Sequence, residues 1–380
     1  MAQRRGTLAS IAAEVGVSRT TVSNAYNHPD QLSPELRERI LAAARARGYT
    51  GPDPTARSLR TRQAGAVGVI LTEHLAYAFE DQASIDFLAG LSESSAGAGN
   101  ALTLIPLGPS QGSEASPLIA AALVDAFVVY SVPHSGPHLD AVLARGVPVV
   151  VCDQPYPAAV SGVGEGAPAY VGINDAEAIA PAARTLVAAG HRRIGIVGKR
   201  LFSDESREGA VTREDVAEAD MHVQRGRITG ALKVFAEAGI TDVPIVTRHF
   251  NDHASAIDAA RELFALAPDV TAVLCTTDSM ALGVLDYCRS VGLDVPGDVS
   301  VTGFDGVQQA LGRGLTTVVQ PNKRKGEAVG QVLTELIEES SSGDDGGSGS
   351  NSNSGKRAAP RIILPTEFSP GRTVAPPRDR

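Results

Sequence analysis

The first fifty residues show a regular alternation of apolar and polar positions. Apolar side chains recur over residues 8–15 at the spacing of one helical face, and Gly16 then interrupts the pattern. Ser18, a favourable N-cap residue, starts a second helical pattern whose inward side carries Val22 and Ala25. Two short helices joined by a tight turn that contains glycine are typical of a helix-turn-helix.

The outward side chains of the second helix are of the types that bind DNA. Arginine pairs with guanine, asparagine pairs with adenine, and serine and threonine bind bases or phosphates. In a helix-turn-helix the second helix enters the major groove, led by its N-terminal residues. The alternative is a small helical hairpin with a merely solvated outer face. The residues that we expect at the DNA are Thr7, Ser18, Arg19, Thr20, Thr21, Ser23, Asn24, Asn27 and Tyr49.

A third helix is predicted to begin at Ser33-Pro34-Glu35 and to end at Gly48. The runs TLASIAAEVGVSRTTVSNAYN and LSPELRERILAAARARGY, followed by the pattern P-x-P-x-A-R-S-L, resemble the LacI/GalR family of bacterial transcription regulators. All three helices, the linker and their order match. Pro52 stands three residues after Tyr49, one residue later than this family usually has its proline.

Residues 51–63 are a linker rich in proline, glycine, threonine and arginine, which is compatible with a plain flexible tether. The resemblance implies more, namely a hinge that folds into a short helix on the DNA operator. Leu59 matches the family leucine that wedges into the minor groove, and Arg57 matches a frequent arginine. Such a wedge costs base unstacking, which contacts with the bent DNA offset.

From residue 66 onward, continuous apolar runs alternate with helical patterns, which predicts parallel sheets covered by helices on both faces. We expect a first set of strands at 66–71, 101–107, 126–130 and 147–152, and a second set at 170–173, 194–197, 243–247, 272–275, 300–304 and 361–364. The predicted fold class is α/β, with an N-terminal three-helix head and two tandem doubly wound lobes like those of periplasmic binding proteins. Ligands of such sheets lie at the carboxyl ends of strands, so we expect a ligand between the lobes.

The expected domain boundaries follow from these patterns. Residues 1–50 form the helix-turn-helix domain, 51–65 the hinge, and 66–380 the effector-binding and dimerisation domain. Within the last, we assign 66–169 and 303–320 to the first lobe, and 170–302 and 321–370 to the second. The low-complexity residues 340–358 are expected to be a disordered insert. Residues 199–222 are a lid or, as we favour, a solvated loop.

Charge is distributed unevenly along the chain. The net charge is −9, yet residues 1–63 contain ten arginines and five acidic residues, a net of +5, which leaves −14 for the remainder. A basic head on an acidic body directs the attraction for DNA phosphates to one end. With no apolar signal segment and no apolar run of membrane-spanning length, we expect a soluble, cytoplasmic protein.

The sequence contains no arrangement typical of an enzyme. Residues 108–112 match G-x-S-x-G, but no helix pattern follows them, so we interpret them as a surface loop. His134 and His138 flank a loop without a third metal ligand nearby. The cysteines at 152, 275 and 288 lie in apolar runs and are expected to be buried thiols. We therefore expect no catalytic residue, metal or cofactor.

The resemblance implies an effector site in the body. Arg227, in an R-x-x-G motif, and Asp278 match the effector-binding arginine and aspartate of the family, and an arginine with a carboxylate can bind adjacent hydroxyls. This chemistry suits a sugar, a sugar phosphate or a nucleoside. Further residues, which follow strands or could stack on the ligand, are Thr72, Tyr77, Phe79, Asp153, Asn174 and Phe250.

These expectations combine into a function. We expect a ligand-responsive regulator, a repressor of sugar or nucleoside metabolism genes, that binds a pseudo-palindromic DNA operator as a homodimer. No leucine-heptad helix follows the last strand, which favours a dimer over a tetramer. The alternative is a solute-binding module of the same two-lobed architecture without a role in gene regulation, against which the basic head argues.

Overall fold

The computed structural model describes residues 6–51, 58, 63–71, 78–107, 116–133, 137–156, 168–342 and 359–378. The chain divides into two compact units, Met1–Gly65 and Ala66–Arg380, which we call the head and the body. Several predictions concern residues outside the described part: Arg57, Leu59, Thr72, Tyr77, the loop 108–112, His134 and residues 343–358 of the low-complexity insert.

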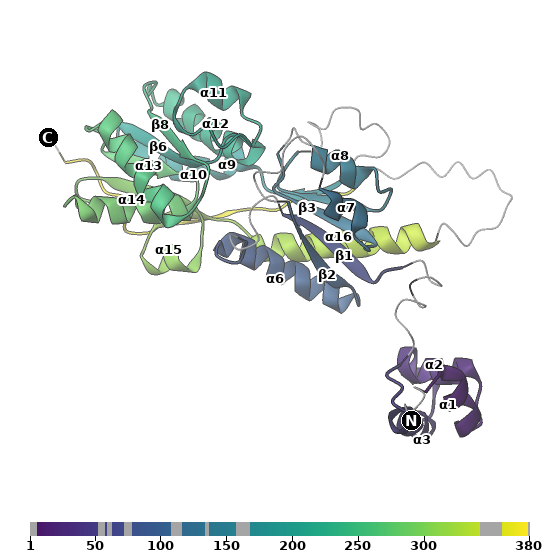
Figure 1. Cartoon of the computed structure of the whole chain (residues 1–380). Helices are drawn as coiled ribbons and strands as arrows, with labels where there is room; N and C mark the ends of the chain where they lie inside the picture. Colours follow the sequence, from purple (N-terminus) through teal and green to yellow (C-terminus); the bar gives the residue numbers. More distant parts are fainter. Residues whose placement is uncertain are drawn as a thin grey trace. The chain divides into compact units, whose positions relative to one another are not determined.

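The head contains three short helices around one small core (Figure 1). They are α1 (Leu8–Val15), α2 (Arg19–Asn27) and α3 (Pro34–Ala46), with the 3-10 turn η1 (Pro29–Gln31) before α3. Gly16 takes a φ of 73°, the left-handed conformation that glycine adopts without strain, so α1 and α2 can turn sharply into one another. Ile11, Val22, Ala25 and Ile40 are fully buried between the helices. The predicted helix-turn-helix is confirmed.

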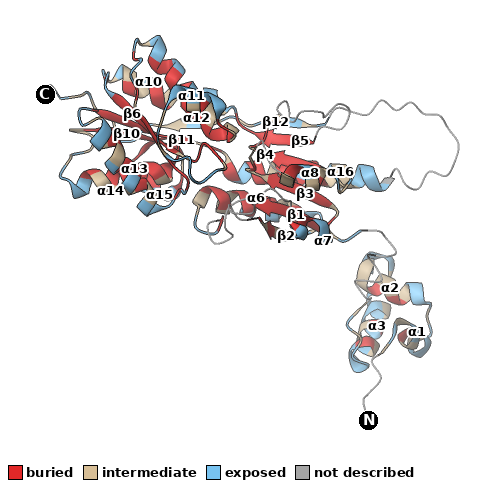
Figure 2. Ribbon diagram, turned by 45° about the horizontal axis from the view of Figure 1, so that its top comes forward, coloured by how far each residue is buried: buried red, intermediate tan, exposed pale blue. Residues whose placement is uncertain are grey.

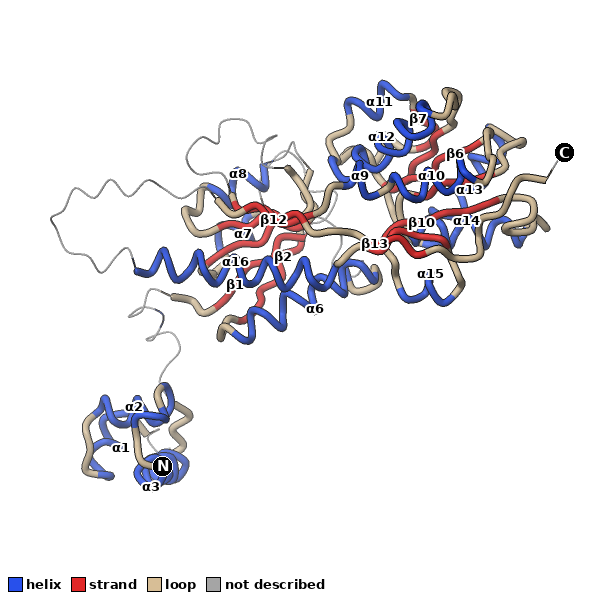
Figure 3. Tube along the Cα trace, turned by 180° about the vertical axis from the view of Figure 1, so that it is seen from behind, coloured by secondary structure: helices blue, strands red, loops and turns tan. Residues whose placement is uncertain are grey.

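The body contains two mainly parallel sheets with helices on both sides (Figure 3). The first sheet has the strand order β12-β5-β4-β3-β1-β2, and every pair in it is parallel. Its strands are β1 (Ala66–Leu71), β2 (Ala101–Pro106), β3 (Ala126–Tyr130), β4 (Val149–Cys152), β5 (Ala169–Gly172) and β12 (Arg361–Ile363). The intervening helices are α6 (Gln82–Gly97), α7 (Pro117–Ala121) and α8 (Pro137–Leu143).

The second sheet has the order β13-β11-β10-β9-β6-β8-β7, with the antiparallel strands β13 and β7 at its two edges. Its strands are β6 (Ile194–Lys199), β7 (Gly209–Val211), β8 (Ile245–Arg248), β9 (Ala272–Cys275), β10 (Ser300–Asp305), β11 (Thr316–Val319) and β13 (Glu367–Ser369). Its helices are α9 (Asp175–Ala178), α10 (Ala180–Ala188), α11 (Arg213–Glu218), α12 (His222–Glu237), α13 (His253–Leu266), α14 (Asp278–Ser290) and α15 (Gln308–Gly312).

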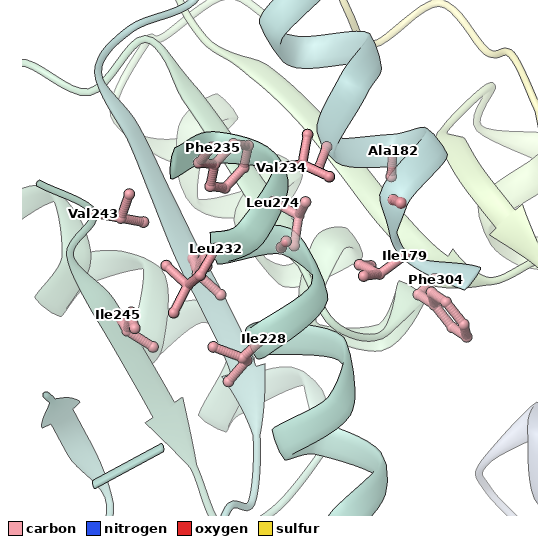
Figure 4. Close-up of a cluster of buried hydrophobic side chains, with 14 of the residues drawn as sticks. Ile179, Ala182, Ile228, Leu232, Val234, Phe235, Val243, Ile245, Leu274 and Phe304 are labelled. Atoms are coloured by element: carbon pink, nitrogen blue, oxygen red, sulfur yellow. The ribbon is translucent and has the colours of Figure 1, made fainter. Parts of the chain in front are cut away.

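The central strands are the most buried part of each lobe (Figure 2). β1, β4 and β5 are buried along their whole length, as continuous apolar runs in parallel sheets require. In the second lobe, one face of the sheet packs on α12, whose Ile228, Leu232 and Phe235 lie in one cluster with Ile245 of β8 and Phe304 of β10 (Figure 4). Cys152, Cys275 and Cys288 are buried free thiols, as predicted.

The division between the lobes differs from our expectation. We assigned 303–320 to the first lobe, but β10 and β11 pair with each other and with β9 in the second sheet. We assigned 170–302 to the second lobe, but β5 pairs with β4 in the first. An apolar strand carries no mark of the sheet that it joins, because that choice is made by pairing between distant segments. The chain crosses between the sheets after β5, after β11 and after β12.

A long helix that our reading of the sequence omitted, α16 (Asn322–Ser342), covers the first sheet beside α6 (Figure 1). We had assigned 321–370 to the second lobe, yet Val329, Val332 and Leu333 belong to the first lobe's core. Their helical spacing is visible in the sequence. The helix also includes residues 340–342, which we expected to belong to the disordered insert.

The acidic stretch 199–222 is not simply a solvated loop. Gly209–Val211 forms the edge strand β7 against β8, and Thr212 caps α11 through a hydrogen bond from the Asp215 N–H. The Ala210 N–H also donates to Glu262 of α13 at 2.9 Å. These contacts fix the segment on the second lobe.

The close approach of α6 and α16 depends on glycine. A Cβ atom at Gly326 would lie 2.1 Å from the Phe87 carbonyl oxygen, whereas one at Gly97 on the exposed side of α6 would meet nothing within 4 Å. We expect Gly326→Ala to lower the free energy of unfolding by about 1–3 kcal/mol, because the two backbones must move apart. Gly97→Ala is the matched control and should stabilise the protein by about 0.5–1 kcal/mol. Urea denaturation midpoints measure both; an unchanged midpoint for Gly326→Ala would contradict the packing.

Candidate DNA-binding head and ligand site

The N-terminus of α2 is the exposed, polar end of the head. Ser18 caps the helix by accepting a hydrogen bond from the Thr21 N–H at 3.0 Å. Val22 and Ala25 face the core, so Ser18, Arg19 and Thr20 face solvent. No acidic residue occupies the first turn. The helix end therefore offers an arginine, hydroxyl groups and the positive end of the helix dipole together, which is an arrangement suited to the phosphates and bases of DNA.

The other predicted DNA contacts are engaged within the head. The Asn24 amide donates to the Gln31 side chain at 2.9 Å, and the Asn27 amide donates to Ser23 Oγ at 3.1 Å. Thr7 caps α1 in a reciprocal pair of hydrogen bonds with Ser10. Tyr49 packs edge-on against Tyr26, with 6.0 Å between the ring centroids. Thr7 and Tyr49 thus have structural roles in the head. All four side chains would have to leave their present partners in order to contact DNA bases.

In the body, a chain of buried polar side chains joins segments that border the crossings between the two sheets. Lys325 of α16 donates to both carboxylate oxygens of Asp153, at 2.9 and 2.7 Å, and to Gln320 Oε1 at 2.9 Å. Gln320 Nε2 donates to Asp305 Oδ1 at 2.6 Å, and Asp305 also faces Arg227. We call this set, together with Asp175, the junction network.

Arg227 is the centre of the second-lobe half of the network. Its Nε donates to Asp175 Oδ1 at 2.9 Å, and its Nη1 donates to the Thr276 carbonyl oxygen at 2.8 Å and to Asp305 at 3.4 Å. The guanidinium lies 3.8 Å from the centroid of the Phe304 ring. Only 4% of the residue is exposed. Arg227 therefore already binds two carboxylates of the protein, and a ligand would have to share or displace them.

The charges in the network depend on one another. Burial opposes the positive charge of Arg227, but Asp175 and Asp305 outweigh it and raise the pKa of the guanidinium. Burial likewise opposes the charge of Lys325, and Asp153 raises the pKa of this amine above its ordinary value. Burial raises the pKa of Asp305, an effect that Arg227 partly offsets. Each buried charge thus depends on its partner, because an unpaired charge inside a protein is costly.

Asp278, predicted to bind the effector, is fully buried and binds the protein itself. Its oxygens accept hydrogen bonds from Thr317 Oγ1 at 2.6 Å, from the Gly306 N–H at 2.7 Å and from the Val307 N–H at 2.9 Å. These bonds attach the start of α14 to the end of β10 and to Thr317 of β11. The carboxylates that face Arg227 belong instead to Asp175 and Asp305. Asp305 ends a buried strand, a position that our rule for ligand sites could have selected.

Two cavities contain or adjoin the remaining described residues that we predicted to bind the effector. The first, of about 430 Å³, lies between the segment before α6 and the N-termini of α13 and α14, and we call it the acidic cavity. Phe79 and Phe250, 58% and 37% exposed, precede its lining residues Glu80 and Asn251 in sequence. Its lining residues are Glu80, Asp81, Asn251, Asp252, His253, Ser279, Leu282, Asp286 and Gln309.

The second cavity, of about 460 Å³, is lined by Asp153 and Asn174 together with Asp175, Tyr156 and Tyr170 among others. Asn174 also caps α9 by accepting a hydrogen bond from the Glu177 N–H. The structure therefore divides the predicted effector residues between two cavities and the buried junction network. The sequence did not lead us to Asp175, Gln320 or Lys325 as site residues. Gln320 and Lys325 lie at the junction only because the chain returns to the first lobe as α16.

Comparisons with known proteins agree with this architecture. Residues 7–51 match the family model described as bacterial regulatory proteins, lacI family, and residues 183–374 match the periplasmic binding protein-like domain. The chain is 50% identical over 379 residues to the HTH-type transcriptional regulator IpsA of Corynebacterium glutamicum, covering 98% of this chain and 99% of that protein. The chain belongs to the LacI family.

Further relatives support the same membership. The HTH-type transcriptional regulator Rv3575c of Mycobacterium tuberculosis is 44% identical and covers 99% of this chain, which spans 98% of that protein. A solved LacI-family regulator from Corynebacterium glutamicum matches with a TM-score of 0.71 and 46% identity, over 98% of this chain and 100% of that one. The lac repressor dimer bound to operator shares the fold at a TM-score of 0.71 and 21% identity, over 98% of this chain and 100% of that one.

This LacI-family member is a DNA-binding transcriptional regulator and not an enzyme. No group of metal-binding side chains gathers within the described ranges. In the part of the chain that the structure covers, no helix is both long and apolar enough to cross a lipid bilayer.

The junction network gives a direct stability prediction. Lys325→Met leaves the largely buried Asp153 carboxylate without its cation, so we expect a loss of about 3 kcal/mol in the free energy of unfolding. Lys323→Met is the matched control on the same helix, because the ion pair of Lys323 with Glu93 is half exposed and should contribute little. Urea denaturation of both variants tests this. Equal losses in the two variants would show that the buried pair has no special role.

Proposed function

We propose that this LacI-family regulator is a repressor that binds a pseudo-palindromic operator as a homodimer and releases it when a small effector binds the body. The exposed N-terminus of α2, with Arg19 and two hydroxyl residues on a basic head, is the observation that supports DNA reading most directly. One such helix covers one half-site, so a two-fold dimer would cover both halves of a pseudo-palindrome. Arg57 and Leu59 remain our candidates for the hinge contacts, with Leu59 as the minor-groove wedge.

The acidic cavity favours a neutral effector with many hydroxyl groups. Four carboxylic acids line it, from Glu80, Asp81, Asp252 and Asp286, and it contains no described lysine or arginine. Carboxylates accept hydrogen bonds from sugar hydroxyls, whereas they repel phosphate. Of the three classes suggested by the sequence, this supports a sugar or a nucleoside over a sugar phosphate. Phe79 and Phe250 could supply apolar rings beside such a ligand.

The junction network supports a route from effector to DNA. The acidic cavity takes side chains from both lobes, so a ligand there favours one relative arrangement of the lobes. A change in that arrangement would alter the hydrogen bonds of Gln320, which links Lys325 of the first lobe to Asp305 of the second. β1 begins the body directly after the linker, so a change in the first lobe can alter the hinge and lower the affinity for DNA.

The DNA contact is tested at the end of α2. Arg19→Ala should weaken binding to an operator selected from random duplexes by about 10- to 100-fold, because a bidentate contact with a base is lost. Arg45→Ala on α3 is the matched control, since it removes the same charge from an exposed pair with Glu38. Fluorescence anisotropy at fixed salt measures both affinities. A loss that is equal in both variants would reduce Arg19 to a general electrostatic role.

The effector site is tested by filling the acidic cavity. Ser279 lies on its wall at the start of α14, and Ser290 is exposed at the other end of the same helix. Wild-type protein is first screened by thermal shift against sugars that include cellobiose and ribose, nucleosides and sugar phosphates. A neutral hit should raise the melting temperature by mass action. Ser279→Leu should abolish this shift and keep operator affinity, while Ser290→Leu should keep both. A shift retained in Ser279→Leu would place the effector elsewhere.

A further inference from the structure

The second lobe contains another pocket, nearer the C-terminal end of α14 than the acidic cavity. Its volume is about 540 Å³, and three arginines line it: Arg289 from the last turn of α14, Arg313 from the end of α15, and Arg372 from the segment after β13. Leu285 and Val295 supply apolar wall. We call it the arginine pocket. Three segments that are distant in sequence thus bring like charges to one concave surface.

The backbone and packing around Arg372 position its side chain. The Arg372 N–H donates to the Gly314 carbonyl oxygen at 2.8 Å. A Cβ atom at Gly314 would lie 2.7 Å from Arg372 Nε, so the arginine side chain lies directly over this glycine. Gly314 has a φ of 73°, which a residue with a side chain rarely adopts. Glycine here leaves room for the guanidinium beside the pocket.

Negative charge at the pocket is already neutralised or occupied. Asp294 is the acidic residue of the lining, and its carboxylate is paired with Arg378 at 3.3 Å. Arg313 donates to Asp286 Oδ1 at 2.7 Å, and that carboxylate belongs to the wall of the acidic cavity. Within the described ranges, neither Arg289 nor Arg372 forms an ion pair with a carboxylate. The pocket therefore carries an excess of positive charge.

We propose that the arginine pocket is a second ligand site, selective for the phosphate group of a small phosphorylated metabolite and coupled to the acidic cavity through the Arg313–Asp286 ion pair. Guanidinium groups match phosphate oxygens in geometry and charge, and an anion relieves the repulsion among three neighbouring cations. The apolar wall and the volume suit the remainder of a small organic molecule. Binding at this site is independent of the function proposed above; only the coupling rests on it.

The coupling follows from the position of Asp286. Its carboxylate accepts from Arg313, and its second oxygen lies 3.7 Å from His253 Nε2 on the acidic cavity. The hydrogen bond and charge of Arg313, with smaller contributions from His253 and Arg289, keep the pKa of Asp286 below its ordinary value. A phosphate that competes for Arg313 would free the Asp286 carboxylate for a ligand in the acidic cavity. Binding at one site would thus change the groups that are available at the other.

Sodium pyrophosphate is the probe, titrated into the full-length protein without DNA or effector at constant ionic strength and followed by calorimetry. Wild-type protein should bind one equivalent with a saturable isotherm. Arg372→Gln and Arg289→Gln should each lower the affinity about tenfold, the loss of one charge-assisted contact. Arg324→Gln, an exposed arginine of α16 in the other lobe, is the control and should leave it unchanged. Absence of saturable binding, or an equal loss in Arg324→Gln, would overturn the site.

Asp286→Asn tests the coupling separately. The variant replaces the carboxylate that competes for Arg313 with a neutral amide, so the affinity for pyrophosphate should rise several-fold, while Arg313→Gln should lower it. An unchanged affinity in Asp286→Asn would overturn the coupling and leave the site itself supported by the Arg372 and Arg289 variants. Because no operator or effector is present, these outcomes are independent of whether the repressor function holds.

Discussion

The body of this regulator depends on charges that are buried in pairs where the chain crosses between its two sheets. Lys325 comes from a helix of the first lobe, Asp153 from the end of β4, and Gln320 from the segment that leaves the second sheet. Each lobe contains both partners of its own ion pair, Lys325 with Asp153 in the first and Arg227 with Asp305 in the second. Gln320 joins the two pairs, because it donates to Asp305 and accepts from Lys325. The two lobes are thus tied by chemistry that has a strict geometric requirement, rather than by apolar contact alone.

Such a junction is suited to a protein with two arrangements. An apolar interface tolerates small displacements, whereas a hydrogen bond to an ion weakens steeply when its geometry changes. Under the proposed function the lobes take two arrangements, and a small difference in ligand affinity between them can shift the population. The close packing of α16 on α6 through Gly326 contributes here, since it sets the position from which Lys325 reaches Asp153 and Gln320.

Different parts of the surface serve different chemistries. The head combines an excess of arginine with an exposed face of polar side chains at the start of α2, while the body carries the acidic excess. The acidic cavity lies along the N-terminal half of α14 and the arginine pocket along its C-terminal half, and one ion pair, Arg313 with Asp286, connects them. A hydroxyl-rich neutral ligand and an anionic ligand could thus be distinguished by the same helix.

The sequence by itself determined the local structure. Apolar spacing, Gly16 and the N-caps Ser18 and Ser33 specify the three helices of the head, and continuous apolar runs specify the strands, because these signals act between neighbouring residues. The tertiary structure alone decided which strand joins which sheet and which polar side chains meet. β5, β10 and α16 lie in lobes that their sequences do not mark, and Asp305 rather than Asp278 faces Arg227. Those outcomes depend on contacts between distant segments, such as the 78 residues that separate Arg227 from Asp305 and the 230 that separate Lys323 of α16 from Glu93 of α6. A local pattern contains no information about such contacts.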